Sequence, residues 1–217
     1  LGNDLTVVNS ARVSFGKRKE KFDNSDRKLV KYLAKHKHFS PFRHLQVQFH
    51  IKAPEFVMRQ WYKHVVGIET TSNSSTKDHA WNEISGRYVE YDEFYQPEIY
   101  RKQSKDNKQA SEGQFVDDEH NLANTNWRQA HAMSLTAYKQ LIEMGMAKEQ
   151  ARCILPLTLY TEVYWTASFQ AVMNFIELRN EKTAQIEIQE YAKSLLDLMS
   201  ESFPKTTKIW SEAHGWL

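Results

Sequence analysis

Hydrophobic residues fall into short periodic runs in the first third of the chain. Residues 26–37 repeat apolar side chains at helical spacing with charges on the opposite face, which predicts an amphipathic helix. Residues 44–52 alternate apolar and polar side chains, and this period of two predicts a half-buried strand. Pro54 suits a first helical turn, so a second helix is predicted over 55–64, closed by Gly67.

The middle of the chain is more polar and less periodic. We expect a long loop over residues 67–81, where Ser, Thr and Asn compete with the backbone for hydrogen bonds. The run SGRYVEY, residues 85–91, predicts a strand. Apolar residues are almost absent from about 100–116, so we predict a mobile surface segment there.

Strong periodicity returns in the last part of the chain. Residues 117–144 predict one long helix. Its candidate core positions are Leu122, Trp127, Met133, Tyr138, Leu141 and Ile142. The elements predicted after it are a short helix at 147–154, a strand at 157–167, a helix at 169–180 with Ser168 as N-cap, and a helix at 184–203. Few strands among longer helices indicate an α+β fold with a small, mostly antiparallel sheet.

Composition narrows the class of protein. With 217 residues and 41% hydrophobic content, the chain can bury one core, so we expect a single domain over 1–217. Its 29 basic and 27 acidic residues are too balanced for general attraction to nucleic acid or membranes. The start lacks the order of a signal peptide, so we expect a cytoplasmic protein. One cysteine, Cys153, excludes intrachain disulfides and zinc sites with several cysteines, and we predict a packed, inert thiol.

Two groups of residues before the helix at 169–180 carry candidate chemistry, each with a plainer alternative. NEISGRY brings together Glu83, Ser85, Gly86 and Arg87, which suits a phosphate, although a glycine turn beside a solvated arginine has the same letters. Arg152 lies among apolar residues and needs a partner, either an anionic ligand or a carboxylate such as Glu149.

Helix 169–180 and the histidines carry the remaining candidates. The helix aligns Gln170, Asn174 and Leu178 before Arg179, forming a ligand-binding or merely exposed stripe. His64 is either a general base or a structural residue at a helix end. No histidine spacing typical of a metal enzyme occurs, so we expect no metal. Lys102, Lys105 and Lys108 are interpreted as a solvated basic loop rather than a nucleic-acid site.

Taken in order, several blocks resemble the flavin-dependent thymidylate synthases. They are GNDLTVVNSARVSF, HKHFSPFRHL, FHIKAPEFVMRQWYKH, NEISGRYVEYDEFYQP, ARCILPLTLYTEVYWT and MNFIELRNEKTAQIEIQEYA. The resemblance implies a methyltransferase that makes dTMP from dUMP. It also implies FAD as cofactor, NADPH and 5,10-methylenetetrahydrofolate as co-substrates, and a homotetramer with active sites shared between subunits.

The resemblance also implies site residues by position. The dUMP contacts would be Gln60, Glu83, Ser85, Gly86, Arg87, Arg152 and Arg179. Arg179 would in addition be catalytic, by polarising the uracil ring. The FAD contacts would be Ser14, Ser40, Arg43, Lys63, His64, Val65, Ser168, Asn174 and Leu178.

This chain departs from the family pattern mainly in its flavin-binding motifs. The Arg-His-Arg signature stands here as Lys63-His64-Val65, and an insertion over about 66–81 follows it. Arg43 stands where the family usually has an acidic residue after Ser-Pro-Phe. Gln170 stands in place of an arginine, and Thr183 stands in place of a histidine. We hypothesise that Arg43 replaces the lost signature arginine. Two alternatives stay open: a related flavin enzyme leaving another one-carbon group on dUMP, and a dUMP-binding protein without turnover.

Overall fold

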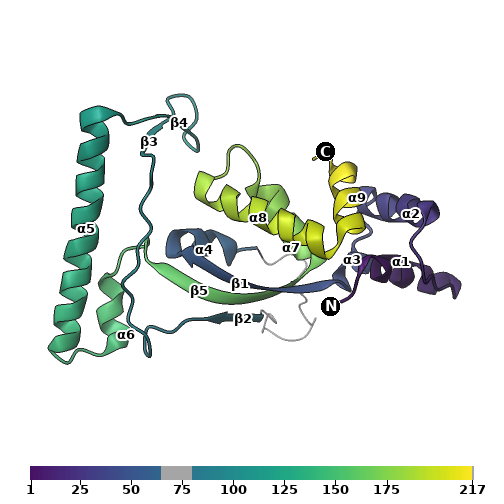
Figure 1. The fold of residues 1–217 in the computed structure, drawn as a ribbon, viewed down its shortest axis with the longest axis horizontal. Coiled ribbons are helices and arrows are strands. Elements are labelled where there is room, and N and C mark those ends of the chain that lie inside the picture. The colour runs from purple at the N-terminus through teal and green to yellow at the C-terminus, as the bar shows by residue number, and fades with distance from the viewer. Residues whose placement is uncertain (65–79, 217) are drawn as a thin grey trace. The chain divides into compact units, whose positions relative to one another are not determined.

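The computed structural model describes residues 1–64 and 80–216, and Figure 1 shows the arrangement of helices and strands. The helices and helical turns are α1 (Asp4–Arg12), η1 (Val13–Phe15), α2 (Asn24–Lys35), α3 (Ser40–Arg43), α4 (Glu55–Trp61), α5 (Asp117–Glu143), α6 (Lys148–Ala151), η2 (Arg152–Ile154), α7 (Phe169–Arg179), α8 (Ile186–Ser202) and α9 (Pro204–His214). The strands are β1 (Gln46–Pro54), β2 (Ala80–Glu83), β3 (Arg101–Gln103), β4 (Ser111–Gln114) and β5 (Tyr160–Ser168). One sheet has the order β1-β5-β2 and the other pairs β3 with β4, which confirms the α+β class with small antiparallel sheets.

The described residues form two compact units. Unit 1 comprises 1–49, 64, 80–81 and 165–216, and unit 2 comprises 50–63 and 82–164. Strands β1, β2 and β5 therefore contribute residues to both units. That residues 1–217 form a single domain stays a prediction. The insertion expected at 66–81 and Gly67 lie outside the described residues, apart from positions 80–81 in β2.

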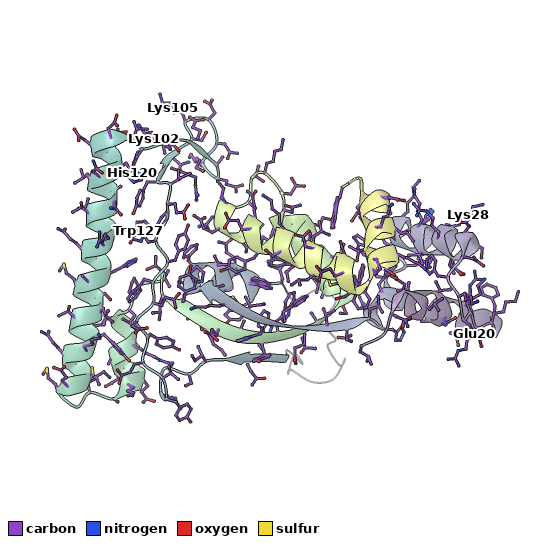
Figure 2. All side chains as sticks on the ribbon, viewed as in Figure 1. Glu20, Lys28, Lys102, Lys105, His120 and Trp127 are labelled. Atoms are coloured by element: carbon purple, nitrogen blue, oxygen red, sulfur yellow. The ribbon has the colours of Figure 1, made fainter. Side chains whose placement is uncertain are left out.

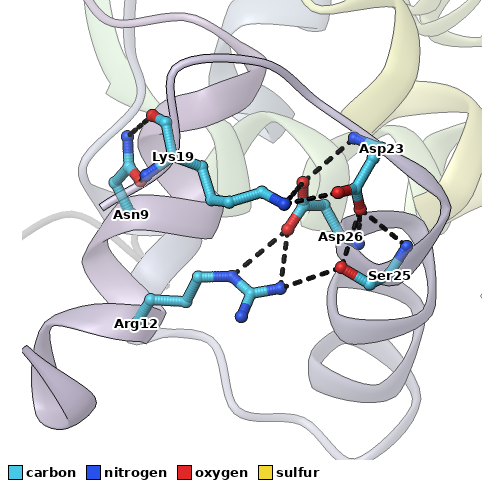
Figure 3. A network of polar contacts seen from close by, with 6 residues as sticks. All are labelled: Asn9, Arg12, Lys19, Asp23, Ser25 and Asp26. Carbon is cyan, nitrogen blue, oxygen red and sulfur yellow. Dashed lines mark hydrogen bonds and ion pairs between the residues drawn. The ribbon is translucent and has the colours of Figure 1, made fainter. Parts of the chain in front are cut away.

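A buried carboxylate joins the first two helices of unit 1 (Figure 3). Asp23 caps α2 by accepting from backbone N–H groups of its first turn. Asp26 is fully buried and accepts from Arg12 at 2.7 Å (Nη2) and 3.2 Å (Nε). Lys19 contacts Asp23 and is held in place through its backbone by the Asn9 amide. A buried charge is tolerated only with such partners, so this network fixes α1 against α2.

Aromatic side chains from distant segments make the centre of unit 1. Trp210 of α9 contacts Phe42 of α3 and Phe169 of α7, with ring centroids 4.9 and 5.7 Å apart. All three side chains are fully buried, and each contributes roughly 1.5–3 kcal/mol of hydrophobic stabilisation. The sequence patterns did not predict α1 or α9, although α9 supplies this central tryptophan.

Helix α5 is nearly as long as predicted, but two of its six expected core positions are exposed, whereas Trp127, Leu141 and Ile142 are half-buried. Leu122 is 62% and Met133 73% exposed, whereas Tyr138 is buried. The face that packs in unit 2 carries polar and aromatic groups at helical spacing instead. Trp127 Nε1 donates to the Tyr95 carbonyl at 3.2 Å.

Two further residues continue this packed face. His131 lies 2.8 Å from the Thr158 hydroxyl and stacks on Phe94. The Ser134 hydroxyl donates to the Ile154 carbonyl at 2.9 Å. A search for hydrophobic periodicity misses such a face because hydrogen bonds replace part of its apolar burial.

The polar segment at 100–116, predicted to be a mobile surface segment, contains a hairpin, and its mobility stays a prediction. Strands β3 and β4 pair antiparallel there. The Gln103 side-chain amide lies within hydrogen-bonding distance of several loop carbonyls, including those of Asn107 (3.2 Å) and Ala110 (3.0 Å). Lys102 and Lys105 extend from this hairpin (Figure 2), and Lys102 pairs with Glu119 at 2.7 Å. Backbone pairing and the Gln103 side-chain amide therefore hold the two strands of the hairpin together.

Candidate functional site

The NEISGRY segment begins at the end of β2 in unit 2. The Thr161 hydroxyl on β5 donates to Glu83 Oε1 at 2.7 Å. One residue later, the Ile84 N–H donates to the Glu162 carbonyl at 2.9 Å. Strand pairing thus fixes Glu83, and the chain leaves the sheet immediately after it.

Residues 85–91, predicted as a strand, form a turn instead. The Ser85 carbonyl accepts from the N–H groups of Tyr88 (3.0 Å) and Val89 (3.1 Å), which closes the chain back on itself. Its hydroxyl accepts from the Arg87 N–H at 3.3 Å. Tyr88 is 83% exposed, so the aromatic and β-branched residues that suggested a strand pack against no second layer.

Gly86 lets this turn approach the side chains of Tyr91 and Arg152 closely. A Cβ atom at this position would lie 2.5 Å from Tyr91 Cε2 and 3.0 Å from Arg152 Cδ. Tyr91 is held by its own hydroxyl, which donates to the Ile84 carbonyl at 3.1 Å. Gly86 of the turn, Tyr91 and the half-buried Arg152 therefore pack together in one stack.

Among the described residues, the ion pairs near this stack do not include the Arg152–Glu149 pair that the sequence left open as an alternative. Glu149 pairs with Arg87 at 3.3 Å, through two largely exposed side chains, rather than with Arg152. An exposed pair of this kind is weak and exchanges readily for a ligand anion. Cys153 is exposed rather than packed, and its thiol donates to the Glu149 carbonyl.

Two residues that the sequence did not single out as candidates, Glu55 and Tyr62, interact electrostatically with Glu83. Burial, and then the charge of Glu83, raise the pKa of Glu55 at the start of α4, while Arg59 and Arg152 oppose the shift. Burial followed by Glu83 also raises the pKa of Tyr62. Both lie within the block FHIKAPEFVMRQWYKH, but the electrostatic interactions of each depend on how α4 and its end are placed by the fold.

The remaining dUMP candidate of unit 2 lies on the same helix. Gln60 is half-buried on α4, with its side-chain amide 3.5 Å from the Phe56 carbonyl one turn earlier. Unit 2 thus holds every predicted dUMP contact except Arg179: Gln60, Glu83, Ser85, Gly86, Arg87 and Arg152.

Three of the nine predicted flavin contacts, Ser168, Asn174 and Leu178, lie on or cap α7 in unit 1. Ser168 caps the helix as predicted, since its hydroxyl accepts from the Ala171 N–H at 3.2 Å. Gln170 is 2% exposed, and its amide oxygen accepts from Arg43 Nε at 2.7 Å. Asn174 is half-buried, and Leu178 is 60% exposed.

His64 and Arg179 meet at the end of α7. Arg179 Nε donates to His64 Nε2 at 2.9 Å, and the His64 ring meets Phe175 edge-on with centroids 4.9 Å apart. Burial, with a smaller effect of the Arg179 charge, lowers the pKa of His64 to about 4. His64 is therefore neutral at physiological pH.

The other flavin candidates lie apart from this end of α7. Ser14 in η1 and Ser40 at the start of α3 are exposed in unit 1. Lys63 is exposed in unit 2. Val65 lies outside the described residues.

Comparison with known proteins decides the family. The model of the family described as "Thymidylate synthase complementing protein" matches residues 1–205. The chain belongs to this family. A relative from Thermus thermophilus, named flavin-dependent thymidylate synthase, is 42% identical over 213 residues, covering 98% of this chain and 73% of the relative. A relative of the same name from Thermosipho africanus is 40% identical, covering 95% of this chain and 85% of its own.

The fold of this chain is also similar to that of a solved structure. The UMP/dUMP methylase PolB from Streptomyces cacaoi, bound with 5-Br dUMP, superposes with a TM-score of 0.82 at 27% identity. The match covers 98% of this chain and 91% of PolB. Among the described residues, no helix is long and apolar enough to cross a membrane, and no group of three His, Cys, Asp or Glu side chains is placed to hold a metal ion.

Proposed function

We propose that this chain is a thymidylate synthase that methylates dUMP to dTMP, with FAD as cofactor and 5,10-methylenetetrahydrofolate and NADPH as co-substrates. The observation that carries the proposal is the packed stack of Gly86, Tyr91 and Arg152 beside the Ser85 turn. It gives an anion a close backbone approach, a hydroxyl and a guanidinium. The names of the relatives and the PolB structure with a bound brominated dUMP support the same substrate.

The dUMP phosphate would be held by the turn and its two arginines. Arg152 presents a planar donor pair fixed by packing against Gly86. Arg87 would exchange its exposed contact with Glu149 for the phosphate, because a dianion competes well with a solvated carboxylate. Gln60 and Glu83 would contact the nucleoside.

Arg179 would act on the pyrimidine ring. A guanidinium placed at a uracil carbonyl stabilises the negative charge that develops there, which makes ring carbon 5 more nucleophilic. Cys153 follows Arg152 rather than a proline and is exposed, so it does not match the Pro-Cys nucleophile of the other thymidylate synthase class. The flavin route needs no such nucleophile, since reduced FAD supplies the hydride when bound.

The residues of unit 1 fit a flavin. Leu178 is exposed beside the half-buried Asn174 on α7, and an exposed apolar side chain next to amide donors and acceptors suits a flat ring with polar edges. Arg43 is exposed, with its Nε fixed by Gln170, so its outer nitrogens can face a pyrophosphate. The resemblance to the family assigns Ser14, Ser40, Lys63, His64 and Val65 as further flavin contacts.

We also propose a homotetramer with shared active sites. Leu122, Met133 and Met144 are exposed large apolar side chains in and just after α5, and an assembly that covers α5 would bury them. Light scattering of the purified chain tests this. A monomer at micromolar concentration would refute the shared site.

The experiment for the reaction is a product assay. The purified chain is incubated with dUMP, methylenetetrahydrofolate, NADPH and FAD, and the nucleotides are separated by chromatography. We expect dTMP, and a parallel reaction with UMP measures selectivity, because PolB is described as acting on both nucleotides. Hydroxymethyl-dUMP instead of dTMP would select the related-enzyme alternative. Calorimetry with dUMP no tighter than inorganic phosphate would refute a dUMP site altogether.

A further inference from the structure

The hydrogen bond between His64 and Arg179 has an unusual acceptor. Arg179 ends α7, and the buried Phe175 one turn earlier holds the His64 ring edge-on. Both members of the pair are half-buried. Phe175 restricts the orientation of the His64 ring, and the 2.9 Å hydrogen bond from Arg179 Nε to that ring restricts the orientation of the guanidinium.

The donor identifies the state of the histidine. A guanidinium has only donors, so His64 Nε2 must carry a lone pair, and the proton of the neutral ring must lie on Nδ1. The lowered pKa of His64 agrees with this neutral state, which follows from the hydrogen bond alone.

A neutral acceptor has a consequence for Arg179. A carboxylate would orient a guanidinium equally well but would cancel its charge. Within residues 1–64 and 80–216, no carboxylate lies within ion-pair distance of Arg179. The imidazole thus fixes Nε and leaves the positive charge and both outer nitrogens for another partner.

We propose that His64 is a positioning residue for Arg179, holding its guanidinium through the unprotonated Nε2 of a neutral imidazole while preserving its charge for the pyrimidine. This assignment rests on the proposed role of Arg179 toward dUMP. His64 would then position a dUMP-binding residue in addition to making its predicted flavin contact.

The first test does not depend on any substrate. Long-range proton–nitrogen NMR spectra of the full chain, with and without FAD, report which His64 nitrogen is protonated. We expect the Nδ1–H tautomer, and we expect Arg179→Met to raise the His64 pKa because a neighbouring positive charge is removed. An Nε2–H tautomer in both states, or a His64 pKa that does not respond to Arg179→Met, overturns the proposal.

The second test separates the acceptor from the ring. Calorimetry measures dUMP affinity of the FAD-saturated chain for His64→Leu, which removes the acceptor, and His64→Gln, whose amide oxygen can accept. We expect about a tenfold loss with Leu and most of it recovered with Gln, since a hydrogen bond to a charged group is worth roughly one to two decades. Equal losses in both variants would overturn the proposal.

Two controls distinguish this inference from other causes. His131→Leu removes another half-buried histidine that bonds a side chain, so it should lower stability without changing dUMP affinity or the His64 spectrum. In the Arg179→Ala background, His64→Leu should cost dUMP affinity no more than about twofold. If the chain binds dUMP in this pattern but makes no dTMP, the proposed reaction fails and the positioning role stands. If dUMP does not bind at all, the NMR result alone decides the inference.

Discussion

Gly86→Ala tests the dUMP cradle by the smallest possible change. The new methyl group would lie 2.5 Å from Tyr91 Cε2, whereas ordinary contact starts at 3.4 Å, so the ring must move by about 1 Å. The Tyr91 hydroxyl bond to the Ile84 carbonyl resists that movement, and Arg152 Cδ blocks the other side at 3.0 Å. Overpacking of this kind costs about 1–3 kcal/mol of unfolding free energy.

The effect on binding should exceed the effect on stability. Displacing Arg152 weakens a charge-assisted contact to the phosphate, worth about 1.5–3 kcal/mol, or roughly one to two decades in dUMP affinity. Calorimetry with dUMP measures this loss, and thermal unfolding of the same samples measures the cost in stability.

Gly113→Ala is the matched control for this variant. Gly113 has a φ of +63° with nothing within 4 Å of an added Cβ, so alanine there costs about 1 kcal/mol through backbone strain alone. It should lower stability comparably and leave dUMP affinity unchanged. If Gly86→Ala binds dUMP as the unmodified chain does, the cradle is not the phosphate site, and if both variants lose affinity, the loss reflects stability only.

Three further predictions concern residues of unit 1. Arg12→Leu leaves the buried Asp26 carboxylate without its main partner, so urea unfolding should reveal a loss of about 2–4 kcal/mol, with Arg12→Lys losing less. Because the pKa of His64 is lowered from 6.5 to about 4, its contribution to stability is complete above pH 6.5 and is lost as the pH falls toward 4. Melting temperatures between pH 7 and 4 should therefore fall less steeply in His64→Leu. Arg43→Ala should weaken FAD binding by one to two decades, measured by flavin fluorescence, and leave dUMP affinity nearly unchanged.

Periodicity in the sequence was sufficient for the elements whose stability comes from one apolar face. The helix predicted at 26–37 is α2, and the alternating run at 44–52 lies within or beside β1. Hydrophobic periodicity failed to predict the packed face of a helix where hydrogen bonds of polar side chains make the tertiary contacts. On α5, His131 and Ser134 bond backbone or side-chain oxygens, while the apolar Leu122 and Met133 are exposed.

Local patterns also could not identify residues that reach the site through tertiary structure. The letters of NEISGRY suggested an anion site, which stays a prediction, whereas the strand predicted there is wrong because residues 86–88 form a turn and Tyr88 is exposed. Glu55 gave no signal at all. Its raised pKa depends on burial and on Glu83, which the sheet brings near from another part of the chain.

The pair Arg43 and Gln170 shows what only the fold can connect. The sequence marks each as a separate departure from the family pattern, 127 positions apart. The Phe169 N–H donates to the Leu45 carbonyl at 2.9 Å, and this backbone bond brings the start of α7 beside the end of α3. The two substitutions thereby become one contact, a guanidinium held by a buried amide. Truncating Arg43 would also leave that amide unsatisfied, at a cost of about 1–3 kcal/mol. A loss of FAD affinity in Arg43→Ala therefore identifies a flavin contact only if it exceeds the loss in Gln170→Leu, which frees the guanidinium but keeps its charge.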